Sequence, residues 1–322
     1  MYYAGIDIGG TKCAVVLGAE SNGEFTVLAK ERFPTVPDDP LGTLDTFRDV
    51  LAGLLSQQEL LPSSLSGIGI SCGGPLSSKR GVILSPPNLP AWDNIEIVRF
   101  FETAFGVPTA LQNDANACAL AEWKFGAGKG ADNMAFLTFG TGLGAGLILN
   151  SRLYCGPDDM AGELGHLRLT DDGPTGYGKA GSVEGYCSGG GIRQLGQQMA
   201  ERELAAGRQP RLLEQAGSIE GINAKNIADL ADEGDPLCLE VYHESGRRLG
   251  QALSILVDLL NPEVIVIGSI FVRSHNLLWE VCDEVMRREC LSISYGRCRV
   301  VGSALGERVG DIAALTVAMG GY

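Results

Sequence analysis

One pattern occurs twice in this chain of 322 residues. The first copy is an apolar run from Tyr2 to Ile8, the turn Gly9-Gly10-Thr11, and a second apolar run from Cys13 to Leu17. The second copy, from Met134 to Asn150, lies about 130 residues further on and is built around Gly140-Thr141-Gly142-Leu143-Gly144. Two strand-like runs joined by a short glycine turn predict a β-hairpin, and a repeated unit predicts two related halves. We therefore expect two lobes, each a sheet with helices, packed around a cleft.

Apolar periodicity places further elements along the chain. Residues from Phe47 to Leu55 show the spacing of one buried helical face. The other expected helices are Arg99 to Phe105, Ala115 to Phe125, Gln194 to Ala205, Ile222 to Ala231, Ser245 to Leu260 and Asp311 to Met319. The other expected strands are Gly67 to Cys72, Pro108 to Gln112 and Glu263 to Gly268. This order is typical of an α/β protein. We expect one lobe to hold residues 1–114 with about 305–322, and the other to hold 115–304.

Charge and cysteine usage limit the partners and the compartment. The chain has 25 basic and 39 acidic residues, a net charge of -14, which repels nucleic acid and anionic lipid. The most apolar stretch, Ala252 to Val272, is interrupted by Asp258, Pro262 and Glu263, so we expect no membrane span. The nine cysteines have irregular spacing, which is typical of reduced thiols. With no secretory signal at the start, these features predict a cytoplasmic protein.

The two glycine turns are candidate phosphate loops. Glycine lets backbone N–H groups approach an anion without interference from a Cβ atom. Neither turn has the spacing of a Walker loop, and Gly140-Thr141-Gly142 leads into a strand, which disfavours a dinucleotide fold. An ordinary hairpin turn is the alternative for a single copy, but two copies with threonine favour phosphate binding. Lys12 is a further phosphate candidate, although a solvated turn lysine is the commoner case.

Asp7 lies in the first apolar run, two residues before the turn. A carboxylate in an apolar strand is costly unless it is paired or faces a metal. The alternative is an aspartate that caps the turn. We favour a group held near phosphate-bound Mg²⁺.

Asn113 and Asp114 follow a predicted strand and open a predicted helix. Both residue types cap helices well, which is the structural alternative. Ligand clefts of α/β proteins open at the ends of strands, so one of the two can also act on a substrate hydroxyl as a general base. Both roles can hold together, one residue capping while its neighbour points into the cleft.

A glycine-rich segment carries a second polar set, Gly162-Glu163-Leu164-Gly165-His166, with Glu184 further along. A carboxylate accepts bonds from adjacent hydroxyls, and a neutral imidazole both donates and accepts, which suits a polyol. We assign structural roles to His243 and His275. A zinc site at His166 lacks closely spaced partners, since Cys187 stands alone.

Taken together, these motifs resemble those of the ROK family, bacterial sugar kinases and related regulators of the actin/hexokinase superfamily. The resemblance covers essentially the whole chain and depends on several motifs in order. They are Gly5-Ile6-Asp7-Ile8-Gly9-Gly10-Thr11-Lys12, Gly73-Gly74-Pro75, Pro87-Asn88-Leu89-Pro90-Ala91-Trp92, Gln112-Asn113-Asp114-Ala115-Asn116-Ala117, Gly140 to Gly146 and Gly162 to His166. The resemblance implies the duplicated actin-like ATPase/hexokinase fold, which is ribonuclease H-like.

The resemblance also implies roles for individual residues. Asp114 is the implied catalytic base, and Asp7 is implied to serve Mg·ATP. The residues implied to hold the sugar are Gly74, Asn88, Asn113, Glu163, His166 and Glu184. The residues implied to hold ATP and its phosphates are Gly9, Gly10, Thr11, Lys12, Thr141, Gly142 and, near the adenosine, Gly268. ATP and Mg²⁺ are thus the expected cofactors, and a homodimer or tetramer is the expected assembly.

Two departures from the family pattern concern metal and nucleotide. Family members carry a Cys-x-Cys-Gly-x-x-Gly-Cys-x-Glu zinc loop, but Thr175, Tyr177 and Ser182 stand at the three cysteine positions here. The loop's glutamate, Glu184, is kept, and we expect no zinc. The usual Gly-Gly of the adenosine motif is Gly268-Ser269 here.

The expected reaction is phosphoryl transfer from Mg·ATP to a hexose hydroxyl, the 6-hydroxyl of a glucose-like sugar. The alternatives are N-acetylmannosamine, fructose or allose as acceptor, an acyl-phosphate kinase on the same fold, and a catalytically idle sugar-binding regulator. Repressors of the family carry a helix-turn-helix before the first phosphate loop. Only six residues precede Asp7 here, so no DNA-binding role is expected.

Overall fold

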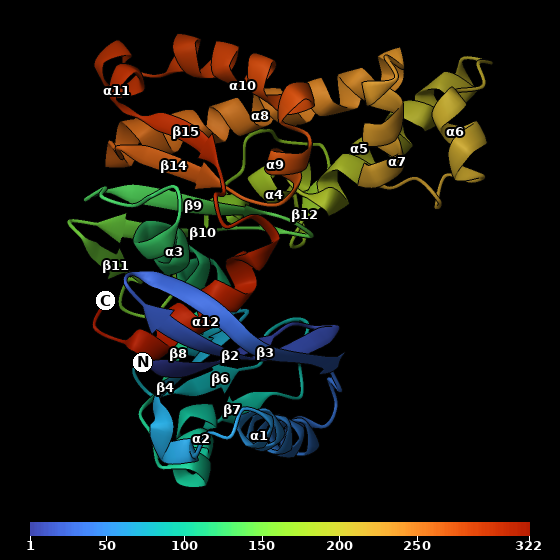
Figure 1. Ribbon diagram of the computed structural model, residues 1–322. Helices are drawn as coiled ribbons and strands as arrows, with labels where there is room; N and C mark the ends of the chain where they lie inside the picture. The colour runs from blue at the N-terminus through green and yellow to red at the C-terminus, as the bar shows by residue number, and fades with distance from the viewer. The chain divides into compact units, whose positions relative to one another are not determined.

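The apolar run at the start of the chain forms the central strand of a five-stranded sheet in the computed structural model, which describes residues 1–322 (Figure 1). This strand, β1 (Tyr2–Ile8), pairs antiparallel with β2 (Lys12–Ser21), which pairs in the same way with β3 (Glu24–Pro34). On its other side β1 is parallel to β4 (Leu65–Cys72), and β4 is parallel to β8 (Thr109–Asn113). The strand order is β3-β2-β1-β4-β8.

A second five-stranded sheet repeats this arrangement with the order β11-β10-β9-β14-β15. Its hairpin strands are β9 (Met134–Phe139), β10 (Leu143–Leu149) and β11 (Arg152–Tyr154). The strand β14 (Val264–Ile267) runs parallel to β9, and β15 (Arg299–Gly302) runs parallel to β14. The two glycine turns therefore occupy corresponding places in two sheets of the same topology, which confirms the predicted duplication.

The chain folds into two units. The first comprises Met1–Asp132, Gly146–Ala161 and Ala304–Tyr322, so it contains both chain ends (Figure 1). The second comprises Asn133–Ala145 and Gly162–Ser303.

In the first unit the C-terminal helix α12 (Val309–Met319) packs directly on β1 and β4. The contact is close because glycines stand on the facing strands. A Cβ atom at Gly69 would lie 2.1 Å from the carbonyl oxygen of Ala314, and one at Gly5 would lie 2.8 Å from the Ala314 Cβ. At the start of the same helix, a Cβ atom at Gly310 would lie 3.8 Å from the Asp7 carboxylate, so the start of α12 lies beside the end of β1.

The other helices of the first unit are α1 (Pro40–Gln57), α2 (Ile97–Phe105) and α3 (Asp114–Phe125). Phe47 of α1 and Phe101 of α2 are fully buried and meet edge-on in the core, with ring centroids 6.4 Å apart. The short strands β5 (Leu76–Ser77), β6 (Val82–Leu84) and β7 (Asp93–Ile95) form a separate small sheet. Two 3-10 turns, η1 (Pro62–Ser64) and η3 (Gly306–Arg308), complete this unit.

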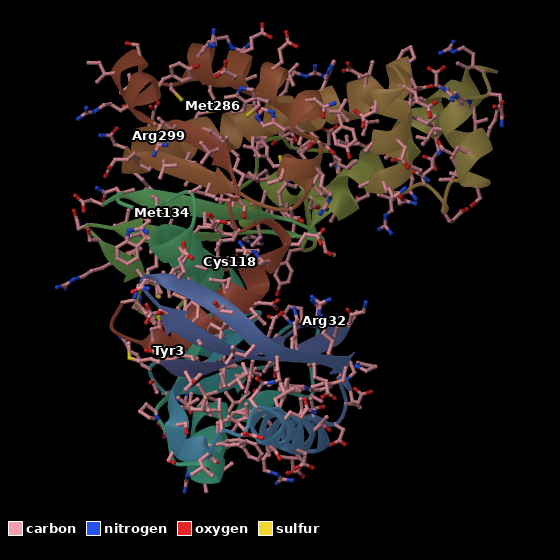
Figure 2. The ribbon with its side chains drawn as sticks, viewed as in Figure 1. Tyr3, Arg32, Cys118, Met134, Met286 and Arg299 are labelled. Carbon is pink, nitrogen blue, oxygen red and sulfur yellow. The ribbon has the colours of Figure 1, made fainter.

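Helices dominate the second unit. They are α4 (Val183–Tyr186), α5 (Gly189–Ala205), α6 (Arg211–Ala216), α7 (Ala224–Asp232), α8 (Pro236–Leu260), α9 (Ile270–Arg273), α10 (His275–Glu289) and α11 (Ser292–Arg297). The long helices α8 and α10 lie against one another, because a Cβ atom at Gly250 would lie only 2.6 Å from the carbonyl oxygen of Cys282. Figure 2 labels Met286 on α10 and Arg299 at the start of β15. The remaining elements are η2 (Leu164–His166) and the two-stranded β12 (Thr175–Gly176) and β13 (Lys179–Ala180).

All nine cysteines are free thiols, as the irregular spacing predicts. Cys118, labelled in Figure 2, lies on α3. None of the helices combines the length and the apolar character that crossing a membrane requires.

Candidate active site

Three acidic side chains gather at the end of β1 in the first unit. Asp7 pairs through its backbone with Ala14 on β2 and with Ser71 on β4, so its side chain is largely enclosed. Burial raises the pKa of the Asp7 carboxyl to about 6, and the negative charges of Asp114 and Asp311 add to this. A hydrogen bond with the Ser71 hydroxyl opposes the shift. A carboxylate kept in such surroundings is typical of a functional site.

Asp311 stands in the first turn of α12 and forms an ion pair with Lys30 of β3. Both side chains are mostly buried, at 20% and 17% exposure for Lys30 and Asp311. The positive charge of Lys30 acts on Asp7 in the opposite sense to Asp311 and lowers its pKa. The two charges of this pair thus act on the pKa of Asp7 in opposite senses.

The first glycine turn is tight and is fixed from one side by Thr35. The Gly9 N–H donates to the Lys12 carbonyl at 3.1 Å, while the Thr35 hydroxyl donates to the Gly9 carbonyl at 2.6 Å. Gly10 lies against another loop, since a Cβ atom there would be 2.6 Å from the Cβ of Asn88. The structure thus brings the first predicted phosphate loop into contact with a predicted sugar-binding residue.

Asn88 is exposed because its neighbours anchor the loop. Leu89 and Trp92 are 2% and 0% exposed, and the Trp92 N–H donates to the Leu89 carbonyl at 2.9 Å. The spacing of the two apolar side chains over one turn leaves Asn88 on the outside, beside Gly10. In this motif, Leu89 and Trp92 anchor the loop in the core, and Asn88 is left at the surface where a ligand can reach it.

Asn113 and Asp114 both contact the first turn of α3. Asn113 is the N-cap of α3 and accepts the Ala115 N–H at 3.0 Å. One carboxylate oxygen of Asp114 accepts the same N–H at 2.8 Å, and the side chain is solvent-accessible. The surrounding protein displaces water and raises the pKa of Asp114, while the Ala115 hydrogen bond lowers it. Gly74 is also close, because a Cβ atom there would lie 3.3 Å from the Asn113 side-chain nitrogen.

In the second unit, the second glycine turn lines a cavity of about 460 Å³. The Gly140 N–H donates to the Gly142 carbonyl at 3.1 Å, and the Gly189 N–H at the start of α5 donates to the Gly140 carbonyl at 2.8 Å. A helix of this length has a partial positive charge at its N-terminus, which favours phosphate. The lining residues are Gly140, Thr141, Gly189, Gly190, Arg193, Asn223, Ser269, Ile270 and Arg273.

Gly268, predicted near the adenosine, comes just before this lining rather than within it. Its N–H donates to the Leu137 carbonyl at 3.0 Å, which ties it to the sheet. Ser269, the next residue, has a φ of 57°, a conformation that glycine adopts without strain. A serine held there is typical of backbone strain at a ligand site.

The segment Gly162-Glu163-Leu164-Gly165-His166 lies on the backbone of β10. A Cβ atom at Gly162 would be 2.1 Å from the Ala145 carbonyl oxygen, and one at Gly165 would be 2.1 Å from that of Leu143. A side chain at either position would clash with the backbone of β10, so glycine is required at both. Glu163 and His166 are exposed.

Glu184 is tied to the second glycine turn. Its carboxylate accepts the Leu143 N–H at 3.0 Å, and a Cβ atom at Gly142 would lie 2.7 Å from the same oxygen. A carboxylate has about four acceptor positions, so this bond leaves room for a ligand. The second unit thus brings Glu184, the glycine turn and the Gly162–His166 segment together.

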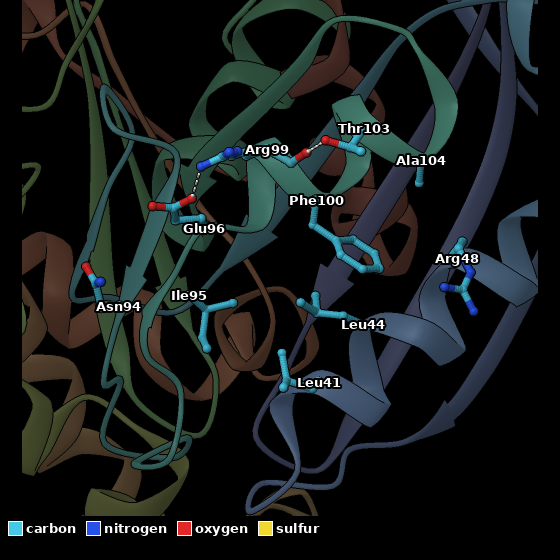
Figure 3. Close-up of a pocket in the computed structure, with 10 residues that line it drawn as sticks. All are labelled: Leu41, Leu44, Arg48, Asn94, Ile95, Glu96, Arg99, Phe100, Thr103 and Ala104. Atoms are coloured by element: carbon cyan, nitrogen blue, oxygen red, sulfur yellow. Dashed lines mark hydrogen bonds and ion pairs between the residues drawn. The ribbon is translucent and has the colours of Figure 1, made fainter.

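A larger groove of about 590 Å³ lies elsewhere in the first unit, between α1 and α2 (Figure 3). Leu41, Leu44 and Phe100 line it, and an ion pair of Arg99 with Glu96 at 3.1 Å stands at its edge. None of the residues selected from the sequence lines this groove.

Comparison with known proteins matches the ROK family model to residues 3–318. The chain belongs to the ROK family. It is 31% identical over 315 residues to the glucokinase of Streptomyces coelicolor, covering 97% of this chain and 94% of that protein. The predicted fold class, a duplicated actin-like ATPase/hexokinase fold, is confirmed by solved ROK structures.

Two solved structures bear on the function. One is a ROK family glucokinase from Streptomyces griseus in complex with glucose and AMPPNP, with a TM-score of 0.77, 30% identity and full coverage of both chains. The other is a ROK family transcriptional regulator, a homolog of the E. coli MLC protein, with a TM-score of 0.83 and 26% identity. That alignment covers 98% of this chain and 77% of the regulator.

The zinc loop of ROK proteins does not fit the residues of this chain. Thr175, Tyr177 and Ser182 offer hydroxyls rather than the thiolates that zinc prefers. The Ser182 hydroxyl is fully buried and accepts the Gly185 N–H at 3.1 Å. No three His, Cys, Asp or Glu residues converge on a point that could hold a metal ion.

Sequence reasoning did not single out several residues of the cavity at the second glycine turn. Arg193 of α5 and Arg273 at the end of α9 both line it, as does Asn223. One available signal was the run Gly189-Gly190-Gly191 after Ser188, a glycine-rich helix start of the kind that binds phosphate. The arginines lie 80 residues apart (273 − 193), so no local pattern connects them.

Proposed function

We propose that this protein is an ATP-dependent hexose kinase that phosphorylates the 6-hydroxyl of a glucose-like sugar. The similarity to the Streptomyces coelicolor glucokinase and to the glucose- and AMPPNP-bound Streptomyces griseus structure supports this proposal. We infer ATP as the phosphate donor and glucose as the acceptor from what these two proteins bind or act on.

The observation that carries the proposal is the placement of Asp114. It is the first residue of α3, at the carboxyl end of β8, and it is solvent-accessible. The Ala115 N–H fixes one of its carboxylate oxygens, and we assign the other to a substrate hydroxyl. The negative charge of Asp114 helps to raise the pKa of Asp7, and we assign Asp7 to the phosphate side of the same group.

In the proposed step the bond between the γ-phosphorus and the β,γ-bridging oxygen breaks, and a bond forms from the sugar 6-oxygen to that phosphorus. The hydroxyl proton passes to the unfixed oxygen of Asp114, and ADP leaves. A carboxylate is too weak a base to ionise an alcohol beforehand, so the proton moves late. Positioning of the two substrates then contributes most of the rate.

The chain offers suitable groups for Mg²⁺. This ion usually takes one or two carboxylates, several waters and substrate phosphates, so a largely enclosed carboxylate such as Asp7 fits it. When bound, Mg²⁺ would neutralise charge on the transferred phosphoryl group. Asp7 would hold it directly or through water, and the backbone N–H groups from Gly9 to Lys12 would face the phosphates.

The remaining predicted residues are proposed in two groups. The residues proposed to hold sugar hydroxyls are Gly74, Asn88, Asn113, Glu163, His166 and Glu184. Thr141 and Gly142 would face phosphate, and Gly268 would back the adenosine region. To these we add Arg193 and Arg273, which line the cavity that we assign to the nucleotide.

A second candidate is a sugar-responsive regulator without catalysis. The TM-score of 0.83 with the ROK transcriptional regulator favours it. Asp114 and Asp7 are hard to explain in such a protein, because sugar binding alone needs neither a base nor a carboxylate beside the phosphates.

The test is ADP release from Mg·ATP with a panel of sugars, namely glucose, mannose, fructose, allose and N-acetylmannosamine. Sugar binding is measured in parallel by calorimetry. We expect turnover with glucose, and the sugar with the highest kcat/KM identifies the acceptor. Binding of a sugar with no turnover on any of them would favour the regulator instead.

A further inference from the structure

The hairpin formed by β12 and β13 stands where ROK proteins carry the zinc loop. Its backbone pairs Thr175 with Ala180 and Gly176 with Lys179. The two connecting residues, Tyr177 and Gly178, have φ values of 45° and 73°. A two-residue turn with both φ values positive matches the twist of a hairpin, so the turn forms without a metal.

Gln194 of α5 holds the first strand of this hairpin. The Thr175 N–H donates to the Gln194 side-chain oxygen at 2.9 Å, and the Gln194 side-chain nitrogen donates to the Thr175 carbonyl at 2.9 Å. The side chain thus pairs with the backbone as a neighbouring strand would. The first turn of the same helix, at Gly189 and Gly190, lines the nucleotide cavity.

Ser182 connects the hairpin to Glu184. Its hydroxyl donates to the Gly176 carbonyl at 3.4 Å and accepts the Gly185 N–H at 3.1 Å as the N-cap of α4. A Cβ atom at Gly176 would lie 2.7 Å from the Glu184 Cβ. The hairpin backbone therefore lies directly against the residue whose carboxylate reaches the second glycine turn.

The second strand of the hairpin holds His166. The Lys179 ammonium donates to the His166 carbonyl at 2.7 Å, and Arg168 donates to the Ala180 carbonyl at 2.8 Å. The Tyr177 ring meets the His166 ring edge-on, with centroids 5.9 Å apart. The hairpin thus contacts both His166, which precedes it in the sequence, and Glu184, which follows it.

We propose that this hydrogen-bonded hairpin does without a metal what a zinc ion would do, and that Gln194, Ser182 and Lys179 are positioning residues for Glu184 and His166. The inference rests on the proposed hexose kinase function. It explains how the loop can keep Glu184 in place although the donors at positions 175, 177 and 182 are hydroxyls.

The test compares Gln194→Ala with Gln198→Ala, a matched change one turn along the same helix at a side chain without hydrogen bonds. Gln194→Ala removes both hydrogen bonds to Thr175 and a longer one, at 3.4 Å, to the Gly190 carbonyl. We therefore expect the KM for sugar to rise roughly tenfold while the KM for ATP changes less than about twofold. Lys179→Met is the second variant, since it removes the bond to the His166 carbonyl from a side chain that is only half-buried. Ser182→Ala should lower sugar affinity and Ser182→Thr should restore it, because threonine keeps the capping hydroxyl.

Metal content gives a readout that does not depend on activity. Purified protein should contain less than about 0.1 zinc per chain, well short of the single ion of a structural site, and a chelator with excess Mg²⁺ should leave sugar binding unchanged. One zinc per chain, or an unchanged sugar KM in both Gln194→Ala and Lys179→Met, would overturn the inference. If no sugar is phosphorylated, the proposed function fails, while zinc content and the sugar Kd of the same variants still decide whether the hairpin acts as proposed.

Discussion

The backbone N–H of Leu143 donates to the carboxylate of Glu184 at 3.0 Å. This bond joins the end of the second glycine turn to a residue predicted to hold the sugar. A ligand bound at the second glycine turn and a ligand bound by Glu184 would therefore both affect the Glu184 carboxylate.

Gly142→Ala tests this connection. The new Cβ atom would lie 2.7 Å from the Glu184 oxygen, so the carboxylate must move, while the backbone at Gly142 is not in the left-handed region. We expect a rise of about tenfold in the KM for sugar, since a charged hydrogen bond to a hydroxyl contributes about 1.5–3 kcal/mol. The measurement is steady-state kinetics with the sugar varied at saturating ATP.

The control for Gly142→Ala is its combination with Glu184→Ala. If the glycine acts through Glu184, the double variant should be no worse than Glu184→Ala alone. Additive losses would mean that Gly142 acts on the nucleotide independently. Gly53→Ala, in open space within α1, should leave activity unchanged.

Because the pKa of Asp7 is raised, we expect the free energy of unfolding to fall as pH rises in the protein free of nucleotide and Mg²⁺. Its folded-state pKa is about 6 against an ordinary value of 3.8. An acid whose pKa is raised by folding contributes stability below pH 3.8, and that contribution is lost as pH rises to about 6. We expect Asp7→Asn to raise the unfolding free energy by about 1–3 kcal/mol at pH 8 and to change it little at pH 4.

Denaturant unfolding at the two pH values makes this measurement. Asp311→Asn should have a smaller effect in the same direction, because Asp311 adds to the raised pKa and its loss frees Lys30 to act on Asp7. Asp45→Asn, at an exposed position on α1, is the control. Equal effects of Asp7→Asn at pH 4 and pH 8 would show that the Asp7 carboxyl is not the group that titrates.

Arg273→Ala tests the proposal that this cavity holds the nucleotide. Arg273 lines the cavity, and its guanidinium makes only a long 3.5 Å contact with the Ser269 hydroxyl, so we expect it to be available to a phosphate or ribose oxygen. Loss of a charge-assisted bond should raise the KM for ATP about tenfold and leave the KM for sugar unchanged. Arg288→Ala on the exposed face of α10 is the matched control. An unchanged ATP KM in Arg273→Ala would remove this residue from the donor site.

Much of the fold follows from local patterns. The repeated glycine turns identify the two related sheets, and Gly106, with a φ of 68°, ends α2 where a glycine stop is expected. The start of α8 is nine residues earlier than predicted (245 − 236), because the Asp235 side chain caps the helix and Pro236 begins it. That signal was present in the sequence and was not used.

Other parts depend on contacts between distant segments. The edge strand β3 is mostly half-buried or exposed and has little apolar alternation, so the sequence did not predict it. The pairing of Asp311 with Lys30 joins residues 281 positions apart. The sequence at Ser182 indicates the loss of a thiolate, but only the fold shows that its hydroxyl caps α4 and supports Glu184.

The central claim is that Asp114 accepts the proton of a sugar hydroxyl during phosphoryl transfer. The most direct measurement compares wild-type protein with Asp114→Asn for phosphoryl transfer from γ-labelled ATP to glucose and for glucose binding by calorimetry. The asparagine keeps the contact with the Ala115 N–H but cannot take the proton, so transfer should fall by about 10²–10⁴-fold while the glucose Kd stays within about twofold. Transfer by Asp114→Asn at close to the wild-type rate would contradict the account.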